Sequence, residues 1–233
     1  MDLFLQTSDY VGVSFWLVSV AMVASTVFFF YEGMQVKAAW RTSLAVTGLV
    51  TLIAAIHYYY MRNYWLYTGE SPIIYRYIDW LLTVPLQMIE FYLILIAAKI
   101  AVSSKVFWRL LIGTLIMLFG GFAGEAGWIN PALGFVIGMA GWIIIIFEIF
   151  RGDSSLAASN NESIKSAFNA LRIIVLVGWA IYPLGYIFGF LTPMIGLGTV
   201  DINALNIIYN LADFVNKILF GLIIWHVAIK DSA

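Results

Sequence analysis

Five ionisable side chains stand inside stretches of the sequence that are otherwise almost wholly apolar. Arg76, Asp79 and Glu90 share one such stretch, and Asp213 and Lys217 share another. An ionisable group at membrane depth is costly, so such residues normally face the interior of a helix bundle and pair with one another. A lysine in that setting has two chemical uses. It can neutralise a carboxylate, or its amine can condense with a carbonyl compound to form a Schiff base.

Helical geometry places the first group of charges on one face. At about 100° per residue, Arg76, Asp79, Thr83, Gln87 and Glu90 all fall within about 80° of one another. The rise of about 1.5 Å per residue separates Asp79 from Glu90 by roughly 16 Å along the helix. The two carboxylates are therefore expected to act as separate stations rather than as a contacting pair.

The second group of charges lies one helical turn apart, and aromatic rings accompany it. Asp213 and Lys217 are four residues apart, the spacing that an ion pair on one helix face requires. Six aromatic residues fall at similar depth and could line a slot for a long, flat, apolar ligand; they are Trp80, Trp142, Trp179, Tyr182, Tyr186 and Tyr209. Position alone leaves both a structural ion pair and a Schiff base open.

The composition indicates which elements must position these residues. The chain has 233 residues, of which 63% are hydrophobic and 11% are charged. A soluble domain is typically about half apolar and a quarter charged, so this chain is expected to lie in a lipid bilayer. The formal net charge of -1 offers no basic excess for binding nucleic acid. The absence of cysteine excludes thiolate metal sites and cysteine nucleophiles.

Seven apolar stretches have roughly the 17 to 25 residues that a transmembrane helix needs. They cover residues 10–31, 43–60, 73–98, 107–124, 132–150, 167–191 and 203–229. Long continuous runs argue against a β-barrel, whose strands alternate over about ten residues. The longest connection covers residues 151–166 and leaves no room for a second domain. The sequence therefore predicts an all-α, seven-transmembrane-helix bundle that forms one domain over residues 1–233.

Small residues and prolines add detail to this bundle. GxxxG spacings that begin at Gly120, Gly134 and Gly185 predict close helix packing. Pro85 and Pro183 lie in mid-helix, where each removes a backbone donor and favours a kink.

Basic residues near the ends of the stretches predict the orientation. Most of them cluster at the first, third and fifth connections and at the C-terminus, namely Lys37, Arg41, Lys99, Lys105, Arg109, Arg151, Lys165, Arg172 and Lys230. Basic residues favour the cytoplasmic side of a membrane. The N-terminus is therefore expected to be extracellular and the C-terminus cytoplasmic.

Four segments carry a family resemblance that covers nearly the whole chain. They are RYIDWLLTVP at residues 76–85, GFAGEAG at residues 121–127, GWAIYPLGY at residues 178–186 and DFVNK at residues 213–217. With them the sequence resembles a microbial (type 1) rhodopsin, and most closely a proteorhodopsin of the blue-absorbing class. The resemblance implies a multi-pass protein of the bacterial inner membrane that is not an enzyme.

The resemblance also implies a cofactor and roles for the charged residues. Lys217 would carry all-trans retinal as a protonated Schiff base. Asp79 would be its counterion and primary proton acceptor, Asp213 the second member of the counterion complex, and Arg76 their electrostatic partner on the exit side. Glu90 would be the cytoplasmic proton donor. The implied function is a light-driven outward proton pump.

Further residues match positions that contact retinal or tune it in the family. The implied retinal pocket comprises Trp80, Thr83, Gln87, Met117, Gly121, Trp142, Trp179, Tyr182, Tyr186, Tyr209, Asp213 and Lys217. The triplet Asp79, Thr83 and Glu90 fits proton transport rather than chloride or sodium transport. Gln87 stands at the colour-tuning position, where glutamine accompanies blue absorption.

Two residues match family positions at the contact between protomers of an oligomer. His57 matches a histidine that pairs with the acceptor aspartate, and Trp16 matches a position that approaches this histidine from a neighbouring protomer. A homo-oligomer, a pentamer or hexamer, is therefore implied. One feature of bacteriorhodopsin is missing, because residues 191–202 offer only Asp201 where that protein has an external carboxylate pair for proton release.

Two other functions are compatible with the same residues. A slow-cycling photosensory rhodopsin would use the same chromophore without net transport. A retinal-free seven-helix transporter or receptor would use the same buried charges for a soluble ligand.

Overall fold

The computed structural model describes residues 4–198 and 200–233 and contains the predicted seven helical spans. Five of them consist of a single helix or of one helix with a short 3-10 turn before it: α1 (Tyr10–Gln35), η1 (Ala38–Trp40) with α2 (Arg41–Thr68), α3 (Ile73–Ala97), α4 (Lys105–Glu125) and α10 (Ile202–Ser232). The fifth span is α5 (Pro131–Arg151), extended by the short helix α6 (Asp153–Ala158). No strand occurs in the described residues, so the all-α prediction is confirmed.

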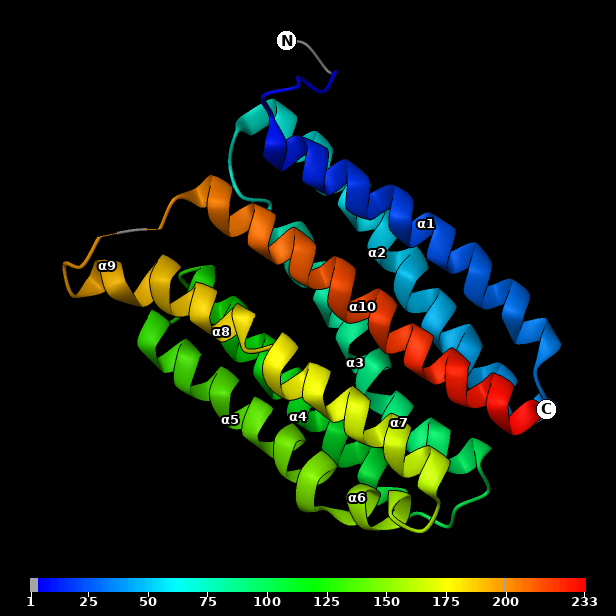
Figure 1. Cartoon of the computed structure of the whole chain (residues 1–233). Helices are drawn as coiled ribbons and strands as arrows, with labels where there is room; N and C mark the ends of the chain where they lie inside the picture. The colour runs from blue at the N-terminus through cyan, green and yellow to red at the C-terminus, as the bar shows by residue number, and fades with distance from the viewer. Residues whose placement is uncertain (1–3, 199) are drawn as a thin grey trace.

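The spans pack around α10 and α3. In Figure 1, α10 lies between the α1–α2 pair and the sixth span, and contacts run from α10 to α1, α2, α7 and α8. α3 contacts α2 and α4, and α4 contacts α5 most extensively. The two helices that hold the predicted charges, α3 and α10, therefore both lie inside the bundle.

Glycine allows the close approach of α4 and α5. A Cβ atom at Gly120 would lie 2.6 Å from Gly138 N, and one at Gly134 would lie 2.8 Å from Gly120 O. Such distances are possible only without side chains, so the GxxxG prediction is confirmed for this pair of helices. Gly185 instead accommodates the side chain of Tyr209.

Polar caps fix where several spans begin. Asp9 Oδ1 accepts from Gly12 N at 2.8 Å at the start of α1, and Asn130 Oδ1 accepts from Ala132 N at 2.9 Å at the start of α5. Asp201 Oδ1 accepts from Asn203 N at 3.1 Å and caps α10. These bonds satisfy backbone donors that a helix start leaves free. Asp201 thus has a structural role at the end of its connection.

The sixth span departs from the single regular helix expected over residues 167–191. It consists of α7 (Glu162–Ile173), the π-helical segment η2 (Ile174–Gly178), α8 (Ile181–Tyr186), the π-helical segment η3 (Ile187–Leu191) and α9 (Thr192–Met194). Pro183 lies inside α8 and cannot donate a backbone hydrogen bond. The connection expected over residues 151–166 is also partly helical, because it contains α6 and the first turn of α7.

Candidate functional site

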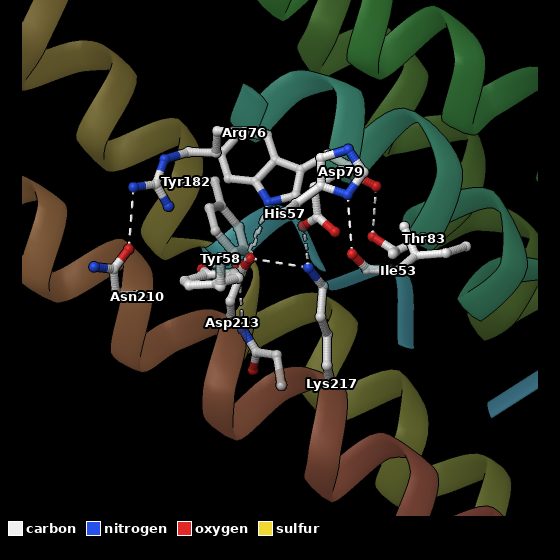
Figure 2. A network of polar contacts seen from close by, with 12 residues as sticks. Ile53, His57, Tyr58, Arg76, Asp79, Thr83, Tyr182, Asn210, Asp213 and Lys217 are labelled. Atoms are coloured by element: carbon white, nitrogen blue, oxygen red, sulfur yellow. Dashed lines mark hydrogen bonds and ion pairs between the residues drawn. The ribbon is translucent and has the colours of Figure 1, made fainter. Parts of the chain in front are cut away.

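The predicted charges of α3 and α10 meet at one point inside the bundle. Lys217 Nζ donates to Asp79 Oδ2 at 2.5 Å and to Asp213 Oδ2 at 2.9 Å. Figure 2 shows the three side chains pointing toward one another. Their side chains are 3%, 0% and 1% exposed, respectively. The predicted ion pair within α10 is therefore present, and a second carboxylate from α3 completes it.

The two carboxylates differ in how they are hydrogen bonded. Asp213 accepts from the hydroxyls of Tyr58 at 2.8 Å and Tyr182 at 2.5 Å, and from Trp80 Nε1 at 3.2 Å. Asp79 Oδ1 has no hydrogen-bond donor in the part of the chain that the structure describes. Hydrogen bonds to a carboxylate stabilise its ionised form. Asp213 is therefore the better stabilised anion, and Asp79 is the less stabilised one.

Arg76 lies beside this complex but is bonded to amides. Its guanidinium donates to Asn206 Oδ1 at 3.1 Å and to Asn210 Oδ1 at 3.0 Å, as Figure 2 shows for Asn210. The rings of Phe15 and Tyr209 lie 5.7 Å and 5.4 Å from its central carbon. Among the described residues, Arg76 forms no ion pair with a carboxylate, so any action on Asp79 or Asp213 is through space.

Thr83 and His57 flank Asp79 from two helices. Thr83 Oγ1 donates to the Asp79 carbonyl oxygen at 2.9 Å, within α3. His57 Nδ1 lies 2.9 Å from the Ile53 carbonyl oxygen in α2, so Nδ1 carries the donated proton and Nε2 remains for another partner. The imidazole is close enough to Asp79 to interact with it electrostatically.

A cavity of about 110 Å³ leads away from the ion pair. Ten of the residues expected at a retinal pocket line it: Trp80, Gln87, Met117, Gly121, Trp142, Trp179, Tyr182, Tyr209, Asp213 and Lys217. Tyr77, Val84 and Leu118 also line the cavity and were not predicted. The lining is mainly apolar and aromatic, which suits a long hydrophobic ligand held at one end by a lysine.

Two residues expected in the pocket lie elsewhere. Thr83 and Tyr186 are not among the residues that line the cavity. The Tyr186 hydroxyl donates to the Pro131 carbonyl oxygen at 2.8 Å and fills the space beside Gly124. Tyr186 therefore connects the sixth span to the start of α5 and does not line the cavity.

Glu90 stands apart from the charge complex, as its spacing predicted. It lies in α3, eleven positions beyond Asp79, and is 1% exposed. No hydrogen bond of normal geometry reaches either of its carboxylate oxygens among the described residues, although the Ser43 hydroxyl of α2 is close enough to interact with it. Burying an ionised carboxylate with so few donors is costly.

Trp16 is a surface residue of α1. Its side chain is 42% exposed and packs beside Tyr59, with ring centroids 6.1 Å apart. The guanidinium carbon of Arg62 lies 5.4 Å from the centre of its ring. The outward face of α1 and α2 thus presents an aromatic surface at this point.

Sequence reasoning missed several polar residues of the site. Asn206 and Asn210 bind Arg76, and Tyr58 binds Asp213. The asparagines repeat at the three- and four-residue intervals that lead to Asp213, so their helical face could have identified them. Tyr58 sits next to His57 in sequence but faces another way, and no spacing rule singles it out.

Comparisons with known proteins agree with this geometry. A family model described as bacteriorhodopsin-like protein matches residues 9–231. The chain is 57% identical to the blue-light absorbing proteorhodopsin of Gamma-proteobacterium Hot 75m4, over 98% of this chain and 90% of that protein. It is 54% identical to the green-light absorbing proteorhodopsin of Gamma-proteobacterium EBAC31A08, over the same shares of the two chains.

A solved structure agrees as well. The crystal structure of blue light-absorbing proteorhodopsin from Med12 aligns with a TM-score of 0.81 and 52% identity, covering 96% of this chain and 100% of that one. The resemblance to microbial rhodopsins, and to proteorhodopsins in particular, is therefore confirmed over almost the full length. The chain belongs to the bacteriorhodopsin-like family of seven-helix membrane proteins.

Proposed function

We propose that this chain is a light-driven proton pump that carries all-trans retinal on Lys217 and moves protons outward across the bacterial inner membrane. One observation carries the proposal: Lys217 Nζ lies 2.5 Å from Asp79 and 2.9 Å from Asp213, buried at the wall of an apolar cavity. A positive charge is stable there, and a proton on Nζ needs to cross only one hydrogen bond to reach a carboxylate. The proteorhodopsin relatives support this function.

The residues that line the cavity support retinal as its ligand. Lys217 places an amine at a cavity that is lined by aromatic and aliphatic side chains, including Met117, Trp142 and Trp179. Gly121 lies in the same wall, where a Cβ atom would come 2.9 Å from the Tyr77 hydroxyl. Bound through its aldehyde to Lys217 Nζ, retinal would supply the visible absorption and a light-driven isomerisation. The protein's own residues determine where the proton of Lys217 Nζ goes.

Asp79 is the proposed proton acceptor. Its carboxylate has one hydrogen bond from Lys217, whereas Asp213 has donors from Tyr58, Tyr182 and Trp80 as well. Protonating Asp213 would weaken all of these bonds, while protonating Asp79 weakens one. The proton of Lys217 Nζ therefore moves to Asp79, and Asp213 remains ionised.

His57 is proposed to modulate that transfer. Its Nδ1 donates to Ile53, which leaves Nε2 as the atom that can share a proton with Asp79. A neutral imidazole with an unprotonated Nε2 can accept a hydrogen bond from Asp79 only when Asp79 is protonated. His57 would thus stabilise Asp79 after it has accepted the proton.

Glu90 is the proposed donor that refills Lys217 Nζ. Its buried carboxyl group, with few hydrogen-bond donors, is suited to hold a proton until Nζ has lost its own. The distance of roughly 16 Å along α3 means that transfer must pass through intervening polar groups. Gln87 Nε2, which has no hydrogen-bond partner among the described residues, lies between the two carboxylates on α3.

The Glu90→Gln variant tests the donor assignment. We expect an unchanged visible absorption band but a recovery of the photocycle at least about tenfold slower, because glutamine cannot donate a proton at this position. Time-resolved absorption after a laser flash measures the recovery. Ser159→Ala, on the exposed α6–α7 connection, is a control that should recover like the parent. Recovery of Glu90→Gln at the parent rate would remove Glu90 from the pathway.

Gln87 is the proposed reason for blue absorption. It is 3% exposed and lines the cavity one helical turn from Thr83, so its amide dipole lies near the proposed chromophore. We expect Gln87→Leu to shift the absorption maximum to longer wavelength, because the dipole is removed while the fold is kept. Leu82→Met, on the lipid-facing side of α3, should leave the maximum in place. An unshifted maximum in Gln87→Leu would assign the tuning to other residues.

The orientation and assembly follow from the same proposal. Basic connections on one side support a cytoplasmic C-terminus, with Glu90 toward the cytoplasm and Arg76 toward the outside. The exposed ring of Trp16 on α1 supports a homo-oligomer, a pentamer or hexamer, in which it approaches His57 of a neighbouring protomer.

Illumination of cells that contain the protein and retinal tests the function. Outward pumping predicts acidification of the medium in light, which a protonophore abolishes. A coloured protein with a photocycle but without acidification would contradict the pump and support a photosensory role. A protein that binds no retinal would contradict both and leave a retinal-free transporter or receptor.

A further inference from the structure

The sixth span contains a wide helical turn that leaves backbone carbonyl groups for other donors. In η2 the Trp179 N–H donates to Ile174 O at 3.0 Å, and in the next turn the Tyr182 N–H donates to Trp179 O at 3.1 Å. A regular α-helix would direct these two donors four residues back, to Val175 O and Gly178 O. Buried carbonyl groups need a partner. The carbonyl groups of Val175 and Gly178 therefore need hydrogen-bond donors from outside the sixth span.

Side chains of two neighbouring helices supply the missing donors. Trp142 Nε1 of α5 donates to Val175 O at 3.2 Å, and Asn216 Nδ2 of α10 donates to Gly178 O at 3.2 Å. Glycine is required for the second bond, because a Cβ atom at position 178 would collide with the Asn216 amide. Side chains of α5 and α10 thus hold the wide turn by one hydrogen bond each.

Asn216 also reaches the charge complex. Its Nδ2 lies 3.5 Å from the Tyr182 hydroxyl, which in turn donates to Asp213 Oδ1 at 2.5 Å. Asp213 accepts from Lys217, the residue that follows Asn216 in the chain. A continuous path of hydrogen bonds therefore runs from the Gly178 carbonyl through Asn216 and Tyr182 to the ion pair. Within this path, the bond that Asn216 donates to the Tyr182 oxygen polarises the hydroxyl that Tyr182 donates to Asp213.

We propose that Asn216 is a positioning residue whose amide couples the wide turn of the sixth span to the Asp213–Lys217 ion pair through Tyr182. The inference rests on the proposed function, because the ion pair affects light absorption only if Lys217 carries retinal. By donating to the Tyr182 oxygen, the amide makes the Tyr182 O–H a stronger donor to Asp213. The stronger bond from Tyr182 reduces the negative charge that Asp213 presents to Lys217 Nζ. Because Asn216→Ala removes the amide, the negative charge on Asp213 should increase in this variant.

A double-mutant cycle on the absorption maximum tests the coupling in the retinal-bound protein. Asn216→Ala should shift the maximum to shorter wavelength, because a more negative Asp213 holds the positive charge at Nζ more firmly. In a Tyr182→Phe background the same substitution should give no shift, since the connecting hydroxyl is gone. Val215→Ala, on the lipid-facing side of α10, is the control and should not shift the maximum in either background. Equal shifts in both backgrounds, or no shift in either, would overturn the coupling.

Hydrogen exchange in the retinal-free protein tests the same bond without the chromophore. Asn216→Ala should speed amide exchange in the peptide covering residues 174–186 at least about fivefold, because the wide turn loses a tie to α10. Asn216→Gln keeps an amide donor and should exchange more slowly than Asn216→Ala. Parental exchange in Asn216→Ala would overturn the positioning role. If the protein binds no retinal, the proposed function fails, while this measurement still decides the role of Asn216.

Discussion

Lys217→Ala is expected to give a folded protein that stays colourless when all-trans retinal is added and moves no protons in light. Alanine offers no amine to the cavity, so a covalent link of the proposed kind cannot form. Visible absorption spectra of parent and variant with excess retinal measure the effect, and complete loss of the band is expected. A visible band in folded Lys217→Ala would contradict the assignment of the attachment site.

The control for this variant must separate loss of colour from loss of fold. Lys217→Ala leaves two carboxylates, Asp79 and Asp213, buried without their cation. Removing one partner of a buried ion pair costs about 3–5 kcal/mol. The double variant Lys217→Ala/Asp79→Asn removes one of the two buried carboxylate charges that have lost their cation, and it should be more stable than the single variant. Far-ultraviolet circular dichroism of the double variant should match the parent, with the retinal band still absent.

Asp79→Asn is expected to abolish light-driven acidification while the protein keeps retinal and colour. Asparagine cannot accept the proton of Lys217 Nζ, so the first transfer has no destination. The substitution also removes one of the two negative charges within 2.9 Å of Nζ. A weaker counterion lowers the energy of the excited state relative to the ground state, and the maximum should therefore move to longer wavelength. A pH electrode and an absorption spectrum measure the two effects.

Asp153→Asn is the matched control for charge neutralisation. Asp153 is an exposed carboxylate that pairs with Arg109 far from the cavity, and its neutralisation should change neither transport nor colour. Acidification by Asp79→Asn at a rate near that of the parent would show that another group accepts the proton.

Composition and helical spacing were sufficient to predict the spans and the ion pair within α10. Apolar stretches of the right length gave the seven helices, because a bilayer permits few other structures. The four-residue interval between Asp213 and Lys217 predicted their ion pair, which the structure contains at 2.9 Å. The meeting of α3 with α10 at Asp79 was implied by the family resemblance, since spacing within one helix says nothing about its neighbours.

Features that depend on contacts between helices could not be predicted. The π-helical segment η2 lies where side chains of α5 and α10 donate to its carbonyl groups, and helix propensity within the segment does not reveal these donors. Tyr186 was expected at the cavity, yet its hydroxyl donates to the Pro131 carbonyl oxygen at the start of α5, a contact between helices that spacing does not predict. Arg76 lies beside the carboxylate complex, as expected, but its hydrogen bonds go to two asparagines of α10 that spacing within α3 could not predict.

Titration of the retinal-free protein with all-trans retinal in the dark tests the covalent attachment most directly. A visible band should grow and saturate at about one retinal per chain, as expected for a single buried site. After reduction with borohydride and proteolysis, mass spectrometry should find the retinyl group on the peptide that contains Lys217. A colourless mixture, or a retinyl group on any other lysine, would contradict the account.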